Sequence, residues 1–133
     1  MTGSSPLADY YLQLANSPIK EGDFAGADIR YSPEYEVLES ELEKAAAMHQ
    51  TDAIDWQKVR EQSEALLREQ SKDLRVASWL TWSLYQREHL SGLQAGLGLL
   101  HQLCSQRWDE LHPRKERTRA AAFCERFGLR LPI

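Results

Sequence analysis

Residues 71–80 read SKDLRVASWL, and this stretch marks the start of the helix that we expect at the centre of the fold. Ser71 is a plausible N-cap. Asp73 would lie in the first turn, where a carboxylate meets free backbone N–H groups and the positive end of the helix dipole. The following residues give the helix a broad apolar surface, which favours a central position: Leu74, Ala77, Trp79, Leu80 and Leu84.

A second helix is predicted over residues 89–108, and its glycines indicate a close neighbour. Gly92 and Gly96 lie four residues apart. A glycine inside a helix costs up to about 1 kcal/mol relative to alanine, and it is retained where another backbone comes close. We therefore expect this helix to pack tightly against the Trp79 helix. Its leucine face is expected to comprise Leu90, Leu93, Leu97, Leu100, Cys104 and Trp108.

A glycine-rich phosphate loop is the competing interpretation of the same stretch. It fails because no strand precedes the glycines and no lysine follows them in the required frame.

The other helices follow from capping residues and apolar spacing. Pro6, with Ser5 as its cap, predicts a helix to about Asn16. Residues 17–32 contain Pro18, Gly22 and Gly26 without a steady period, which predicts a loop. Three more helices are predicted. One begins at Ser32-Pro33 and has an apolar face of Tyr35, Leu38 and Leu42, and one begins at Asp55 and has a buried face of Trp56, Val59, Ser63, Leu66 and Leu67. The third is a basic helix over RKERTRAAAFCERF at 114–127.

No stretch shows the alternation or the hairpin turns of a β-strand. The sequence therefore predicts an all-α fold, a compact bundle of about five to six helices with a long loop between the first two. Most glutamates of residues 34–43 should lie on the solvent side.

The length and the charge of the chain limit the classes of function that it could have. A chain of 133 residues is the size of one domain. Its net charge of −4 gives no support to nucleic-acid binding. Residues 1–70 carry 6 basic and 14 acidic residues, whereas residues 71–133 carry 10 basic and 6 acidic ones. This dipolar charge fits docking between proteins, although acids at helix starts and bases at helix ends would also produce it.

The sequence contains few signals for a cellular location or for a disulfide framework. Cys104 and Cys124 are too few for a disulfide framework. No apolar run is long enough to insert into a membrane, and the first residues lack a secretory signal. A reduced, cytoplasmic location is the default expectation.

Candidate chemistry is sparse. Two half-sites for a metal exist, His101 with Cys104 and Asp109 with His112, each three residues apart. Zinc needs three or four converging ligands, so a hydrogen-bonded histidine is the preferred interpretation. No nucleophile elbow or Cys–His pairing is evident. We therefore expect no cofactor, no metal and no catalysis, but binding to other proteins. A metal-assisted enzyme remains the alternative from another class.

Four segments in order resemble one known family. They are GADIRYSPEYEVLESE at 26–41, DWQKVREQSEALLREQSKDLRVASWL at 55–80, GLQAGLGLLHQL at 92–103 and RWDELHP at 107–113. Together they resemble the ImpA-type N-terminal domain of the TssA family of bacterial type VI secretion systems. The resemblance covers about residues 22–123. It departs from the family after Phe123, where the usual Trp-Leu pair is replaced by Cys124-Glu125-Arg126-Phe127.

The resemblance implies a cytoplasmic scaffold that helps to assemble the contractile tail. Expected partners are baseplate, sheath and inner-tube proteins, with oligomerisation through regions outside this chain. The 133 residues would then be a single domain cut from a longer protein. A generic helical adaptor outside secretion is the alternative.

The same resemblance assigns structural or interaction roles to particular residues. Arg75 is expected to pair with Asp28 or Glu34. The full set of expected residues is Asp28, Arg30, Tyr31, Trp56, Asp73, Leu74, Arg75, Trp79, Gly92, Gly96, Trp108, Asp109 and His112.

Overall fold

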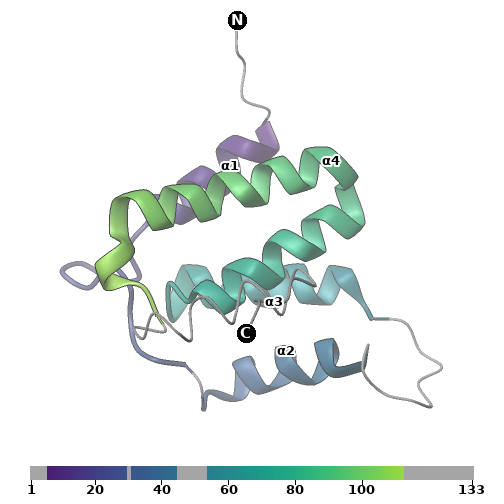
Figure 1. The fold of residues 1–133 in the computed structure, drawn as a ribbon. Helices are drawn as coiled ribbons and strands as arrows, with labels where there is room; N and C mark the ends of the chain where they lie inside the picture. Colours follow the sequence, from purple (N-terminus) through teal and green to yellow (C-terminus); the bar gives the residue numbers. More distant parts are fainter. Residues whose placement is uncertain (1–5, 30, 45–53, 113–133) are drawn as a thin grey trace, which may run out of the picture.

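The computed structural model describes residues 6–29, 31–44 and 54–112. They form four α-helices and a short 3-10 helix, and this part of the chain contains no β-strand (Figure 1). The elements are α1 (Pro6–Asn16), α2 (Pro33–Glu43), α3 (Trp56–Glu69), α4 (Leu74–Arg107) and η2 (Trp108–Glu110).

The all-α class is therefore confirmed, but the described residues hold four helices rather than five or six. The two helices expected around Trp79 and over residues 89–108 form one element, α4. His89 bends it sharply with φ 56° and ψ −131°, outside helical geometry. We call residues 74–88 the first arm and residues 90–107 the second arm of α4. Figure 1 shows that α4 turns back on itself, so that its two arms run alongside each other. The predicted cap Ser5 and the predicted helix at 114–127 lie outside the described residues.

Capping residues explain where α2 and α3 begin. The hydroxyl of Ser32 accepts a hydrogen bond from the Tyr35 backbone N–H at 3.1 Å. The carboxylate of Asp55 accepts one from the Lys58 N–H, also at 3.1 Å. Both side chains satisfy a backbone donor that has no partner inside its own helix. Both predicted helix starts are confirmed.

The core surrounds the first arm of α4. Helices α1 and α3 pack on α4, and α2 packs on α3. Trp79 is almost fully buried, and its ring centroid lies 5.3 Å from that of Tyr35 on α2. The side chains of Leu74, Leu80 and Leu84 are fully buried as well. The apolar surface predicted for SKDLRVASWL therefore forms the centre of the fold.

Gly92 and Gly96 in the second arm of α4 allow it to pack closely against the first arm. A Cβ atom at Gly92 would lie 2.0 Å from the carbonyl oxygen of Leu84, and one at Gly96 would lie 2.7 Å from the Thr81 side chain. The expected close packing against the Trp79 helix is thus confirmed.

The expected leucine face is only partly correct: Leu100 is buried and Cys104 packs against the core, but Leu90, Leu97 and Trp108 are exposed. The second arm turns inward the face that carries its glycines, so Leu90 and Leu97 on the opposite side are exposed. The buried face consists of Gly92, Ala95, Gly96, Leu99 and Leu103, with Leu100 at its edge.

Candidate functional site at the junction of three motif segments

Segments far apart in the sequence meet at one place beside the start of α4. The backbone N–H of Lys72 donates to the Ala25 carbonyl at 2.7 Å. The His112 N–H donates to the Lys72 carbonyl at 3.1 Å, and the Leu74 N–H donates to the His112 carbonyl at 2.6 Å. The Ala27 N–H also donates to the Gln70 carbonyl at 3.3 Å, so three of the four motif segments share one hydrogen-bonded core. We call this set the motif junction: residues 25–28, 71–75 and 112.

Gly26 allows the junction to close. Its φ of 72° lies in the left-handed region, and a Cβ there would be 2.2 Å from the Gln70 carbonyl oxygen. The Gly26 carbonyl oxygen lies 2.9 Å from Nε2 of His112. Only glycine combines this backbone conformation with such a close approach. His112 is therefore a buried, hydrogen-bonded side chain that links residues 86 positions apart.

Asp73, rather than Ser71, is the N-cap of α4. Its fully buried carboxylate accepts hydrogen bonds from the backbone N–H groups of Arg75, at 2.8 Å, and Val76, at 3.4 Å. Ser71 was expected as the cap, but it lies two residues earlier and forms an isolated bridge with Gly26. The pairing of the chain before α4 thus delays the helix start to Asp73.

Arg75 completes the cap by pairing with the same carboxylate. Its Nε donates to Asp73 Oδ1 at 3.1 Å and its Nη2 to Oδ2 at 2.7 Å. The guanidinium also lies 5.2 Å from the centre of the Tyr35 ring, a cation–π distance. Burial opposes its charge, but the hydrogen bond and the charge of Asp73 outweigh burial and raise the pKa of Arg75.

The expected partner of Arg75 was only partly correct. Asp28 Oδ1 lies 4.0 Å from Arg75 Nη2, at the limit of an ion pair. Among the described residues no ion pair joins Arg75 to Glu34. Asp73 is the main partner because the cap already holds its carboxylate two residues away.

Lys72 is a buried residue that the sequence did not reveal. Its Nζ donates to the carbonyl oxygens of Leu14, at 2.8 Å, and Leu67, at 2.7 Å. These carbonyls lie in the last turns of α1 and α3, where they lack partners within the helix and carry the negative end of the dipole. Burial and, to a smaller extent, the charge of Arg68 lower the pKa of Lys72 to about 8. A lysine just before an N-cap carries no sequence signal of burial.

Four exposed residues belong to the motif junction or lie within five residues of it in the chain, and we call them its rim: Asp28, Tyr31, Trp108 and Asp109. Tyr31 is 82% exposed and the Asp28 side chain 47% exposed. Trp108 and Asp109, in η2, are exposed as well. Arg30, expected in this region, lies outside the described residues. The rim therefore offers two aromatic rings and two carboxylates to solvent.

The remaining expected residues divide between core and surface. Trp56 is half-buried and packs against the core. His101 is exposed and Cys104 half-buried. Within residues 6–29, 31–44 and 54–112, no group of three or more His, Cys, Asp or Glu side chains is placed to hold a metal ion.

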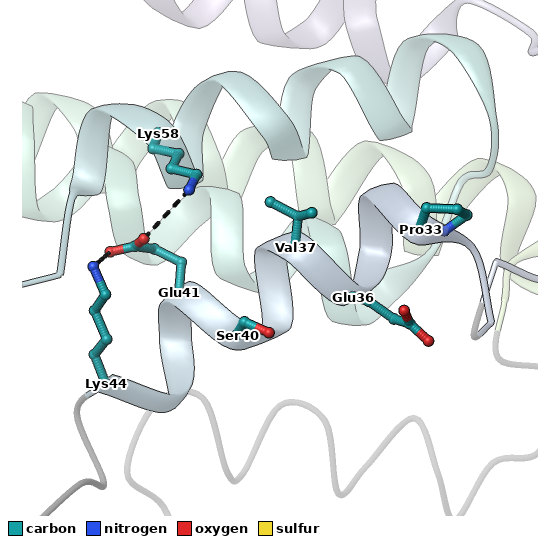
Figure 2. A pocket seen from close by; sticks show the side chains of 7 residues that line it. All are labelled: Pro33, Glu36, Val37, Ser40, Glu41, Lys44 and Lys58. Carbon is teal, nitrogen blue, oxygen red and sulfur yellow. Dashed lines mark ion pairs between the residues drawn. The ribbon is translucent and has the colours of Figure 1, made fainter.

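An open groove of about 600 Å³ runs along α2 beside Lys58 of α3. Figure 2 shows Glu41 in this groove between two lysines. Glu41 was expected at the surface, but it is only 5% exposed. It accepts a hydrogen bond from the Asp55 backbone N–H at 2.8 Å and pairs with Lys44 at 2.9 Å and Lys58 at 3.7 Å. It therefore ties the end of α2 to the start of α3.

None of the helices in the described part of the chain combines the length and the hydropathy required to cross a membrane.

Comparisons with known proteins agree with this arrangement. Residues 16–128 match the family described as ImpA, N-terminal, type VI secretion system. Among curated proteins, none matches the chain.

One solved structure is similar to this chain. It is the N-terminal domain, including the conserved ImpA_N region, of the TssA component of the type VI secretion system from Burkholderia cenocepacia. The two share 31% sequence identity with a TM-score of 0.71. The match covers 96% of this chain and 48% of that one, so this chain spans about half its length. The chain belongs to the ImpA N-terminal family of the type VI secretion system.

Proposed function

We propose that the chain acts as a structural component of a type VI secretion system, in the manner of TssA. It assists assembly of the contractile tail in the cytoplasm through contacts with baseplate, sheath or inner-tube proteins. It does so as a scaffold and not as an enzyme.

The proposal rests on the hydrogen bonds that the buried polar side chains of the motif segments form. Asp73 is engaged by two backbone N–H groups and by Arg75, and Lys72 by two carbonyls. His112 lies at hydrogen-bonding distance from Gly26. Buried groups that are satisfied in this way fix a backbone. This supports a rigid platform for binding rather than a reacting centre.

The exposed rim of the motif junction is the surface that we assign to partner binding. Tyr31 is largely exposed to solvent. Asp28 lies three residues before it in the chain, and its carboxylate is 4.0 Å from the Arg75 guanidinium. Tyrosines are enriched in protein interfaces because they offer a large, rigid contact area with a polar end. A partner would therefore find an aromatic anchor with a charged neighbour.

Replacement of these residues in the bacterium that encodes the protein tests the proposal. With a fluorescent sheath protein, we expect gene deletion to reduce the number of extended sheaths and Tyr31→Ala to reproduce much of that loss. Tyr10→Ala is the matched control, because Tyr10 is an exposed tyrosine on α1. Normal sheath assembly after gene deletion would contradict the scaffold role. A defect that is equal in both tyrosine variants would contradict the assignment of the rim.

A further inference from the structure

The outward face of α2 forms one wall of the open groove beside α3. The residues of α2 that line it recur at spacings of three and four, so they share one side of the helix: Pro33, Val37, Ser40 and Lys44. Val37 is 43% exposed and gives the groove an apolar centre. The eleven residues of α2 span about 16 Å, or three helical turns. The groove therefore has the length of a short helix.

One edge of this face carries a row of three glutamates. Glu36, Glu39 and Glu43 are spaced three and four residues apart, so they lie along the same side of α2. Figure 2 shows Glu36 pointing away from α3, whereas Lys58 borders the groove from α3. Among the described residues, no basic side chain forms an ion pair with any of the three. We call this set the acidic row.

The stability of α2 does not explain the acidic row. A glutamate in the first turn, such as Glu36, faces the positive end of the helix dipole and favours the helix. Glu43 is the last residue of α2 and meets the negative end instead. Glu39 and Glu43 are also four residues apart, a spacing at which like charges repel. These two side chains contribute nothing favourable to the helix, which points to a role outside it.

We propose that the outward face of α2 binds a basic amphipathic helix of another protein. An apolar side chain of that helix covers Val37, and arginines or lysines spaced three and four residues apart pair with the acidic row. Lys44 and Lys58 lie on the opposite edge and are already paired with Glu41. They disfavour a second row of bases there, so the groove accepts the helix with its basic side toward the acidic row.

Other occupants fit this face less well. A second copy of the same face would place one acidic row against another, and nucleic acid would bring phosphates to it, so both would be repelled. The groove is open, and three turns of helix bury less than the roughly 800 Å² per partner of a standard interface. We therefore expect a dissociation constant of about 10–100 µM that rises with salt. This inference does not depend on the role in tail assembly.

Binding of a synthetic peptide to the 133-residue chain tests the proposal. The probe is a fluorescein-labelled, lactam-stapled helix of about 15 residues with arginines along one side and leucines beside them, because an unstapled helix of that length is marginal in water. Fluorescence anisotropy should show binding at about 50 mM salt and about tenfold weaker binding at about 300 mM. A peptide of the same composition with its arginines distributed around the helix should bind about tenfold more weakly.

Two double variants with the same change in net charge locate the site. Glu39→Lys with Glu43→Lys should weaken binding by about tenfold or more. Glu61→Lys with Glu69→Lys, at exposed glutamates of α3, is the matched control and should weaken it by less than about threefold. Val37→Ser should weaken binding without a change of charge.

Three results would overturn the proposal. The first is an equal loss in the two double variants, which would show attraction to net charge alone. The second is equal binding of the two peptides. The third is a lower melting temperature for the Glu39→Lys, Glu43→Lys chain than for the control, measured by circular dichroism. The acidic row would then pair with bases of this same chain, such as those of RKERTR at 114–119, and would not await a partner.

Discussion

Asp73 and Arg75 form a two-point ion pair across the first turn of α4, with Nε–Oδ1 and Nη2–Oδ2 distances of 3.1 and 2.7 Å. The same carboxylate caps the helix. The aspartate is fully buried, and the Arg75 side chain is only 14% exposed. The cap and the ion pair therefore share the Asp73 carboxylate. Loss of either Asp73 or Arg75 leaves the charge of the other largely buried without its main partner.

Asp73→Ala should lower the free energy of unfolding by about 3–5 kcal/mol, because it removes a cap and leaves a buried guanidinium without its main partner. Urea denaturation measures the change. Asp109→Ala, at an exposed aspartate, is the control and should shift stability by less than about 0.5 kcal/mol. A double-mutant cycle with Arg75→Ala should give a coupling energy of about 0.5–3 kcal/mol. Additive effects would contradict the pairing.

Alanine substitutions at the helical glycines distinguish the effect of close packing on stability from the effect of helix propensity. Gly92→Ala and Gly96→Ala should each destabilise by about 1–3 kcal/mol, because the new methyl group would overlap Leu84 or Thr81 of the first arm. Gly98→Ala meets nothing within 4 Å and should stabilise by up to about 1 kcal/mol. Thermal unfolding of the three variants provides the measurement. Stabilisation at Gly96 would show that the arms are further apart than described.

Gly26 and Gly22 form a second matched pair, since both have positive φ, at 72° and 82°. Gly26→Ala adds an overlap with the Gln70 carbonyl to the backbone strain and should cost about 2–5 kcal/mol. Gly22→Ala meets no neighbour within 4 Å and should cost only about 1–2 kcal/mol. Chemical denaturation compares the two variants. Equal losses would mean that the motif junction does not require close contact at Gly26.

Lys72 makes stability depend on alkaline pH. Its pKa is about 8 in the folded chain and 10.5 ordinarily. Between these values the unfolded chain binds more protons, so the free energy of unfolding should rise with pH. Lys72→Met should remove this rise, and Lys58→Met, at a half-exposed lysine, should retain it. The measurement is urea denaturation from pH 7.5 to 10.5, and a wild type that lost stability relative to Lys72→Met over that range would contradict the prediction.

Glu41 makes stability rise with pH in the same way, but in the acidic range. Burial opposes its charge, but the Asp55 N–H and the two lysines outweigh burial and lower its pKa below 4.5. Its stabilising contribution is therefore present above pH 4.5 and is lost as pH falls through the lower folded value. Glu41→Gln should cost about 1–3 kcal/mol at neutral pH and should flatten the acid dependence. Glu36→Gln, on the exposed side of the same groove, should leave both unchanged.

The predicted helix starts at Ser32-Pro33 and Asp55 are confirmed, because a cap is a contact between neighbours in the chain. The motif residues also indicated the family correctly. The expected pairing of Arg75 was less accurate, since the sequence offered several carboxylates and only the fold shows that Asp73 is held in reach.

The amino-acid sequence by itself determined the helical class and family, because capping, apolar spacing and motif order are local properties of the chain. Only the tertiary structure decided which face of residues 90–107 turns inward, since the glycines allow a closer approach to the first arm than the leucines would. It also decided that Lys72 and Glu41 are buried. Each has partners on another segment, the Leu14 carbonyl for Lys72 and the Asp55 N–H and Lys58 for Glu41, and only folding brings these within reach.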